Sequence, residues 1–205
     1  MIRFFDIIFS ILGLIFLSPV FLVILLAIKI TSKGPVFYMQ SRVGKQNADF
    51  KLFKFRTMYV NAEKSSLLTI GDKDKRITKT GFFLRKYKLD ELPQLLNVLI
   101  GNMSLVGPRP EVRKYVNFYT PAQMGVLSVK PGITDWASII YRDENKILAR
   151  SQNPELEYIN TILPEKIKYN QIFIKNFNSF EYFKILSATI LKVIFPGIQF
   201  KFTNL

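Results

Sequence analysis

The first 30 residues are the most apolar part of the chain. No charged side chain occurs among residues 7–28, a run of 22, and a helix needs about 20 apolar residues to cross a bilayer. The pair Ser18-Pro19 interrupts the run, and a proline inside a helix removes a backbone hydrogen bond and bends the axis. The run is too long for a signal peptide, and no small-residue cleavage site follows it.

Basic residues flank this run on both sides, with Arg3 before it and Lys29 and Lys33 after it. Basic flanks stay on the cytoplasmic side of a membrane, so both ends are expected on the same face. Residues 1–30 are therefore expected to form a re-entrant helix that enters one leaflet, breaks at Ser18-Pro19 and returns. A kinked single-pass anchor fits the same pattern about equally well.

The pattern then changes to short alternating segments. Residues 34–58 predict a β-hairpin, with "VFYMQSR" and "FKLFKFR" as strands around a Gly/Asn/Asp turn. In the second strand, period-two alternation places Lys54 and Arg56 on one face. Residues 59–80 predict a surface loop or short helix, and residues 81–88 a short basic helix.

Helix and turn signals organise the remainder. We expect a helix from Asp90, as N-cap, to Gly101, with Pro93 in its first turn. "SLVGPRPE" and "KPGIT" predict turns, and Pro108 and Pro110 fix the backbone around Arg109. Residues 155–177 predict one or two helices with a stop near Pro164.

The C-terminal segment, residues 181–205, is apolar and has Lys184 and Lys192 on one helical face. This spacing is typical of an amphipathic helix at a membrane surface, and a core helix with two exposed lysines is equally common. The chain is thus expected to be mainly α with a small β-hairpin (α+β). We divide it into a membrane helix (1–30), a middle domain (31–180) and a C-terminal helix and tail (181–205).

Charge and composition narrow the chemistry. The 205 residues include 29 Lys and Arg against 15 Asp and Glu, a formal charge of +14, which predicts nucleic acid, anionic lipid or a phosphorylated substrate as partner. Cys and His are both absent. A disulfide framework, a His-activated nucleophile and a His-based zinc site are therefore excluded. A nucleophile must be a carboxylate, a hydroxyl or a lysine amine, and a metal must be a hard cation held by oxygen, most simply Mg²⁺.

Within "RKYKLDELPQLLN", the acid pair Asp90-Glu91 follows a run of basic residues. One interpretation is structural: both acids cap a helix and complement its dipole. The other is catalytic, because Arg85, Arg109, Lys54 and Arg56 supply donors suited to phosphate oxygens. An aspartate in this field is expected to stay ionised and to attack phosphorus. A neighbouring glutamate can take a proton or help hold Mg²⁺.

Several motifs together resemble one family. "FLSP", "QSRVGK", "FKLFKFRTM", "LDELPQLLNVLIGNMSLVGPRPE", "VKPGIT" and "FIKNFNSFEYFKIL" occur in order over almost the whole chain. This text resembles the bacterial sugar transferases, which are monotopic polyprenyl-phosphate phosphoglycosyl transferases. The resemblance implies transfer of a sugar-1-phosphate from a UDP-sugar to undecaprenyl phosphate with release of UMP. It further implies a protein at the cytoplasmic face of the bacterial inner membrane that initiates surface-glycan assembly.

The resemblance also assigns roles to residues of this chain. Asp90 falls on the nucleophile that forms a covalent phosphosugar intermediate, and Glu91 on the residue that assists attack by the lipid phosphate. Both adjoin the Mg²⁺ site. The substrate-binding positions fall on Arg85, Arg56 and the element Pro108, Arg109, Pro110. Ser18 and Pro19 fall on the re-entrant break, which favours re-entry over a single pass.

Two positions depart from the family pattern. Asn102 stands where many members have an acid, which changes any support that this acid gives to a metal or a buried pair. "PGITDWAS" replaces a more usual "PGITG" text, so Asp135, Trp136 and Ser138 are expected to line the site or set sugar specificity. The donor sugar is therefore not assigned.

The main alternative is a non-enzymatic basic module that binds a membrane surface or nucleic acid. Basic and aromatic residues alternate in 36–58, as in stacking and phosphate contacts. The uncharged N-terminal run has no role in such a module, and the acid pair would repel phosphates. We therefore expect UDP-sugar, undecaprenyl phosphate and membrane as partners and no nucleic acid, and leave a homodimer open.

Overall fold

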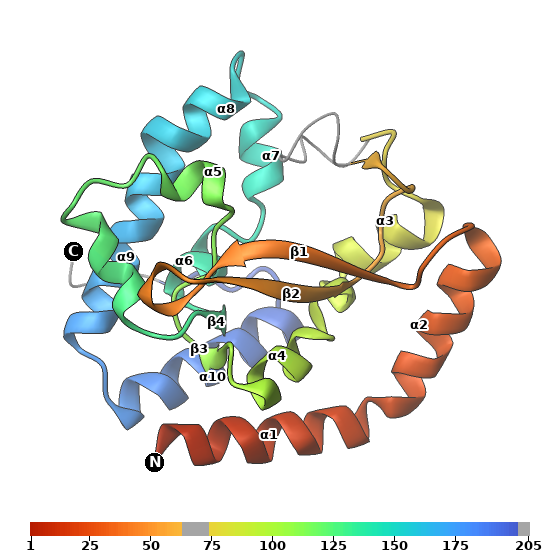
Figure 1. Ribbon diagram of the computed structural model, residues 1–205, viewed down its shortest axis with the longest axis horizontal. Helices are drawn as coiled ribbons and strands as arrows, with labels where there is room; N and C mark the ends of the chain where they lie inside the picture. Colours follow the sequence, from red (N-terminus) through yellow and green to blue (C-terminus); the bar gives the residue numbers. More distant parts are fainter. Residues whose placement is uncertain (63–73, 201–205) are drawn as a thin grey trace.

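The computed structural model of the chain describes residues 1–62 and 74–200, and Figure 1 shows its elements in order. Two helices form the N-terminus, α1 (Ile2–Phe16) and α2 (Ser18–Thr31), with a bend of 60° between them. Pro19 lies in the first turn of α2, where a missing N–H breaks no helical hydrogen bond. The Ser18 hydroxyl donates to the Ile15 carbonyl over 2.8 Å. The predicted break at Ser18-Pro19 is confirmed.

A helix that spans a membrane must be long enough and sufficiently apolar. Among the described residues, no single helix meets both needs, and only the bent pair α1–α2 does so when taken together. Insertion of this pair into a membrane stays a prediction.

The predicted hairpin is present as β1 (Phe37–Val43) and β2 (Asp49–Phe55), which pair antiparallel with Phe37 opposite Phe55. A short 3₁₀ turn, η1 (Lys45–Asn47), connects the strands. The Asn97 side chain covers the outer edge of β2: its Oδ1 accepts from the Phe53 N–H (2.9 Å) and its Nδ2 donates to the Lys51 carbonyl (2.8 Å). One amide thus fixes the hairpin to the helix that follows the acid pair.

A second, parallel pair of strands was not predicted. Both β3 (Ser104–Val106) and β4 (Gly132–Thr134) lie in segments that were expected to be turns. The two backbones touch beside the strands, because a β-carbon on Gly132 would stand 2.1 Å from the Gly107 nitrogen. Glycine is required at this contact, and strands of three residues are too short to produce a recognisable alternation.

The acid pair lies between two helices, α3 (Lys79–Lys86) and α4 (Gln94–Ile100). The prediction that Asp90 is an N-cap is wrong. Asp90 belongs to a 3₁₀ turn, η3 (Leu89–Glu91), and α4 begins only after Pro93. The predicted helix end is confirmed at Gly101, which has φ of +101°. Of the loop or helix predicted for residues 59–80, residues 63–73 lie outside the described residues.

Helices dominate the C-terminal half. They are α5 (Arg113–Val116), η4 (Gln123–Ser128), α6 (Trp136–Ile140), α7 (Glu144–Leu148), α8 (Pro154–Glu157), a π-helical segment η5 (Tyr158–Ile162), α9 (Leu163–Lys175) and α10 (Ser179–Ile194). The stop predicted near Pro164 is wrong. Pro164 occupies the first turn of α9, where proline is tolerated, and the chain stays helical through η5.

Three groups of buried side chains hold these elements together. The largest joins α4 and β3 to α10, with Val98, Met103, Leu105, Tyr182 and Ile185 among its members. Phe5 and Phe9 of α1 pack against it. A second group lies between α5, η5 and α9, and a third joins α2 to Phe55 of the hairpin. The buried face of α10 therefore belongs to the main body, and the division of the chain into three parts stays a prediction.

Candidate active site

The acid pair sits where α3 ends and the chain turns towards α4. Lys88 has a left-handed backbone (φ 58°) and reverses the chain just before η3. Asp90 is 6 % exposed. No hydrogen bond to its carboxylate is found among the described residues, so its oxygens are not committed to a protein donor there. A buried carboxylate without such donors is unusual outside functional sites.

Glu91 has the opposite surroundings. The Arg109 guanidinium binds both of its oxygens, with Nη1 donating to Oε2 over 3.0 Å and Nη2 donating to Oε1. The Lys54 ammonium lies 3.8 Å from Oε1 on the other side. A two-pronged contact of this kind fixes the orientation of both partners. Glu91 thus holds Lys54 and Arg109 next to Asp90.

The titration of these groups follows from burial and from each other's charge. Burial and the nearby charge of Glu91 raise the pKa of Asp90, and the cations Lys54, Arg85 and Lys88 only partly offset this. Burial also pulls the pKa of Glu91 upward, but Arg109 and Lys54 outweigh it and hold that pKa well below its ordinary range. These surroundings thus favour the ionised form of Glu91 and disfavour that of Asp90, the residue that was expected to stay ionised. A further cation at the site would stabilise the ionised form of Asp90.

Among these groups, Lys54 is the cation whose pKa is lowered towards neutral pH. Burial lowers its pKa to about 8, and the charges of Arg109 and Arg42 add to the shift while Glu91 opposes it. Conversely, the charge of Glu91 raises the pKa of Arg109. Lys54 is thus the group of this cluster whose charge changes near neutral pH.

Arg109 stands on a rigid loop that leaves β3. Its backbone N–H donates to Asp135 Oδ2 over 3.2 Å, and the neighbouring Pro108 carbonyl accepts from the Gly132 N–H over 3.0 Å. Asp135 also caps α6, because its Oδ1 accepts from the Ser138 N–H over 2.6 Å. The predicted lining role for Asp135 is wrong. This residue is fully buried and positions the Arg109 loop.

The other departures from the family pattern lie in α6 and in the turn after α4. Trp136 is 5 % exposed and donates its indole N–H to Glu181 over 2.7 Å, and Ser138 lies two residues further along α6. Asn102 is exposed in the turn after α4, where its N–H donates to the Asn97 carbonyl over 3.0 Å. No contact between Asn102 and the acid pair is found among the described residues.

Arg85 and Arg56, both predicted to bind substrate, lie in different parts of the structure. Arg85, in the last turn of α3, is half-buried and close enough for its charge to lower the pKa of Asp90. Arg56 lies one residue beyond the end of β2. The strand that was predicted to carry both Lys54 and Arg56 on one face therefore carries only Lys54. Its guanidinium donates to the carbonyls of Ser32 (3.0 Å) and Lys33 (2.5 Å) after α2. Carbonyls at a helix end attract cations, and Arg56 ties β2 to α2.

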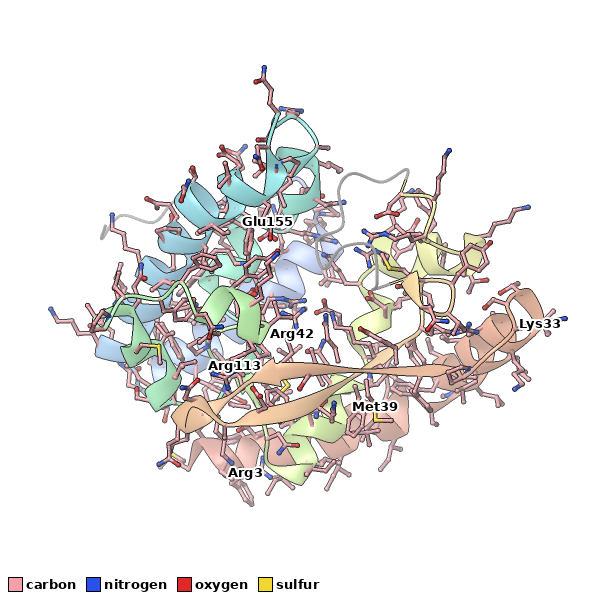
Figure 2. The ribbon with its side chains drawn as sticks, turned by 45° about the horizontal axis from the view of Figure 1, so that its top comes forward. Arg3, Lys33, Met39, Arg42, Arg113 and Glu155 are labelled. Atoms are coloured by element: carbon pink, nitrogen blue, oxygen red, sulfur yellow. The ribbon has the colours of Figure 1, made fainter. Side chains whose placement is uncertain are left out.

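The structure adds Arg42, which was not singled out from the sequence. Arg42 donates to Gln40 Oε1 from Nε (3.0 Å) and Nη2 (2.8 Å) and to the Pro110 carbonyl from Nη1 (2.9 Å). It lies on the same face of the hairpin as Lys54, and Figure 2 shows Arg42 on one side of the ribbon and Met39 on the other. The period-two alternation of "YMQSR" was the signal that could have found it. We call Arg42, Lys54, Asp90, Glu91 and Arg109 the dyad cluster.

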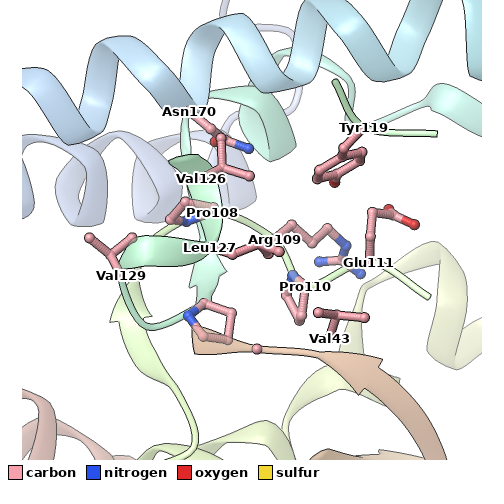
Figure 3. A pocket seen from close by; sticks show the side chains of 12 residues that line it. Val43, Pro108, Arg109, Pro110, Glu111, Tyr119, Val126, Leu127, Val129 and Asn170 are labelled. Atoms are coloured by element: carbon pink, nitrogen blue, oxygen red, sulfur yellow. The ribbon is translucent and has the colours of Figure 1, made fainter. Parts of the chain in front are cut away.

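A small cavity lies behind the Arg109 loop, lined by residues that include Val43, Pro108, Tyr119 and Asn170 (Figure 3). Its volume is about 20 Å³, room for one water rather than a sugar. Asn170 Oδ1 is buried here and has no hydrogen-bond partner among the described residues. A bound water would satisfy this atom.

The dyad cluster can act on a phosphate. Preorganised cations beside an uncommitted carboxylate provide both the charge that stabilises a phosphoryl group and a nucleophile that can attack it. Within the described residues, no group of three or more Asp, Glu, His or Cys side chains could enclose a metal ion. Mg²⁺ nevertheless binds through one or two carboxylates together with substrate phosphates and water, so the Asp90 carboxylate fits this ion.

Known proteins resemble the chain over nearly its whole length. A family model described as bacterial sugar transferase matches residues 1–196. A UDP-N-acetylgalactosamine-undecaprenyl-phosphate N-acetylgalactosaminephosphotransferase of Aeromonas hydrophila is 36 % identical over 197 residues, which cover 92 % of this chain and 42 % of the relative. A UDP-glucose:undecaprenyl-phosphate glucose-1-phosphate transferase of Klebsiella pneumoniae is 39 % identical over 91 % of this chain and 38 % of the relative.

The relatives that match this chain differ in length. The chain spans less than half of the two transferases above. In contrast, the uncharacterized sugar transferase EpsL of Bacillus subtilis is 38 % identical over 199 residues, which cover 96 % of this chain and 89 % of that protein.

Proposed function

The chain belongs to the bacterial sugar transferase family, and from this premise we propose that it transfers a sugar-1-phosphate from a UDP-sugar to undecaprenyl phosphate and releases UMP. The observation that carries the proposal is the dyad cluster: Asp90, buried and without a donor among the described residues, lies beside Glu91, which holds Lys54 and Arg109. The printed names of the two longer relatives describe transfers of this class.

The reaction is proposed in two steps. First, a carboxylate oxygen of Asp90 attacks the phosphorus that carries the sugar. The bond from this phosphorus to the bridging oxygen breaks, and UMP leaves with that oxygen and the electron pair. In the second step, an oxygen of undecaprenyl phosphate attacks the same phosphorus. The acyl–phosphate bond breaks, Asp90 is regenerated, and a sugar diphospho-undecaprenol is formed.

The cations assist both steps by binding phosphate oxygens. Arg109 can exchange one Glu91 oxygen for a phosphate oxygen, since its guanidinium presents several donors in one plane. Lys54 and Arg42 face the same side of the hairpin and add charge that stabilises the developing negative charge on phosphate oxygens. Arg85 acts from α3, and Glu91 orients the cations and assists attack by the lipid phosphate.

Mg²⁺ is the expected cofactor. Asp90, with Glu91, would hold it together with diphosphate oxygens, and the ion would supply positive charge that screens the diphosphate and polarises the leaving group.

The proposed acceptor is a lipid, and the outer faces of α1 and α2 fit a membrane position. Large apolar side chains are exposed along both helices, for example Phe4 (63 %), Phe16 (83 %), Val23 (65 %) and Ile30 (82 %). Contiguous exposed apolar surface marks sites of membrane or protein contact. We therefore infer a re-entrant α1–α2 pair at the cytoplasmic face of the inner membrane. A cysteine in place of Ile2 should resist labelling from the periplasmic side, and labelling there would rule re-entry out.

One experiment tests the reaction and identifies the donor. The protein is incubated with undecaprenyl phosphate, Mg²⁺ and each member of a UDP-sugar panel, and UMP is measured. We expect UMP with one or a few donors, and none from Asp90→Asn even without the acceptor. Asp143→Asn is the matched control, because this carboxylate is 65 % exposed and pairs only with its neighbour Lys146 among the described residues. Full activity of Asp90→Asn would refute the proposal.

A further inference from the structure

Asp6 is a buried carboxylate in the middle of the apolar helix α1. It is 2 % exposed, and its Oδ1 accepts three hydrogen bonds, from the Leu105 N–H (2.9 Å), the Ser104 hydroxyl (3.0 Å) and the Tyr182 hydroxyl (2.8 Å). The donors come from β3 and α10, far from α1 in sequence. A charge is retained in such a place only where several donors compensate its lost hydration.

Arg3, the other charged residue of α1, makes a second attachment one turn earlier. Its Nη1 donates to the Val98 carbonyl (2.5 Å) and its Nη2 to the Leu99 carbonyl (3.0 Å), both near the C-terminal end of α4. A cation at this end of a helix is favourable. Every charged side chain of α1 is thus turned towards the main body, and Figure 1 shows α1 running along α4.

The two attached elements adjoin the two partners of the Glu91–Arg109 contact. Glu91 lies three residues before α4, and Arg109 lies three residues after β3. The Arg109–Glu91 contact depends on the relative position of these elements, because it needs two parallel hydrogen bonds. α1 binds α4 through Arg3 and β3 through Asp6, and so bridges both sides of the site.

We propose that Asp6 is a positioning residue for the transfer reaction. Through β3 it sets where Arg109 stands relative to Asp90 and Glu91, and the helix expected in the membrane thereby aligns the active site. This inference rests on the proposed function. The contact that carries it is the hydrogen bonding of the Asp6 carboxylate to β3, the strand that leads to Arg109.

The proposal is tested by the rate of UMP release from the donor alone, measured for membrane-reconstituted full-length variants. Asp6→Ala removes the acceptor of all three donors, and we expect the single-turnover rate constant of UMP release to fall on the order of 100-fold, the effect of a misplaced catalytic group. Asp6→Asn keeps the Oδ1 acceptor and should restore the rate to within about fivefold of wild type. Ser10→Ala is the control, because Ser10 is equally buried on α1 and its hydroxyl has no partner among the described residues.

A double-mutant cycle separates positioning from a general structural role. If Asp6 acts through Arg109, Asp6→Ala should lower the rate of Arg109→Lys far less than that of wild type, because the contact that it aligns is already lost. Equal factors in the two backgrounds would overturn the proposal. Should Asp6→Ala fail to fold, Tyr182→Phe, which removes one donor, replaces it in the same cycle. If the wild-type protein releases no UMP, the proposed function and this inference are refuted together. If the wild-type protein releases UMP and Asp6→Ala does so at the same rate, this inference alone is refuted.

Discussion

Replacing Arg109 by alanine tests the ion pair at the centre of the dyad cluster. The pair is largely buried, with 26 % of the Arg109 side chain and 14 % of the Glu91 side chain exposed. After the change, Lys54, at 3.8 Å, is the one cation that forms an ion pair with Glu91 among the described residues. Removing one partner of a fully buried pair costs about 3–5 kcal/mol, and partial exposure reduces this here to about 2 kcal/mol. For a chain of this size, the midpoint of thermal unfolding should fall by roughly 4–8 °C.

The same substitution should slow catalysis. Removing one preorganised donor to a developing negative charge lowers kcat by about 10²–10³, so UMP release from the donor should fall by that factor. Arg113→Ala is the matched control, because Arg113 also pairs with a carboxylate, Asp49, but both side chains are exposed (40 % and 52 %). An exposed pair contributes about 0–1 kcal/mol.

The assays are thermal unfolding and UMP release on the two variants in parallel. Arg109→Ala should lose both stability and rate, and Arg113→Ala should lose neither to a comparable degree. If the two variants behave alike in both assays, the assignment of Arg109 to the site is refuted.

Three further predictions follow from the same geometry. The rate of UMP release should decline as the pH rises through about 8, because the Lys54 pKa is lowered to about 8 by burial and its charge is then lost. Lys54→Arg should move this decline to higher pH, since arginine stays protonated, and an unmoved pH profile would exclude Lys54 as its cause. In EDTA at pH 7, Asp90→Asn should raise the free energy of unfolding, because burial and Glu91 raise the pKa of Asp90 and so disfavour its ionised form. This gain should vanish below about pH 4, where Asp90 is protonated in both the folded and the unfolded state. The prediction is contradicted if urea titrations at pH 7 find the wild type more stable than Asp90→Asn. Gly132→Ala should lose at least about 2 kcal/mol and slow UMP release, because the added carbon would stand 2.1 Å from the Gly107 nitrogen. Gly125→Ala, where nothing lies within 4 Å, should be neutral in both measurements, and equal effects would show that the contact does not matter.

The features that the sequence predicted well depend on local chemistry. Proline and serine at 18–19 mark the break between α1 and α2, aromatic alternation marks the hairpin, and Gly101 marks the end of α4. Each has a physical cause within a few neighbouring residues. The grouping of Lys54 and Arg109 with the acid pair came from residue type and family resemblance, and the structure brings these four residues together.

The features that were missed depend on long-range contacts. The three-residue strands β3 and β4 exist only because their backbones meet through Gly107 and Gly132. The helix α4 begins at Gln94 and not at Asp90, because the acid pair belongs to the separate 3₁₀ turn η3. Asp6 gave no signal in the sequence, since the partners of its carboxylate are nearly a hundred or more residues away.

A covalent intermediate on Asp90 can be detected as label bound to the protein. Protein is mixed with a UDP-sugar labelled in its sugar, without acceptor, quenched within a turnover, digested and analysed by mass spectrometry. We expect a sugar-phosphate on the peptide that contains Asp90, discharged by undecaprenyl phosphate and absent from Asp90→Asn. A rival reaction, in which the lipid phosphate attacks the donor directly and Asp90 only binds metal, leaves nothing on the protein. UMP and lipid-linked sugar formed at the normal rate, with no label on the protein at any time, would rule out Asp90 as the nucleophile.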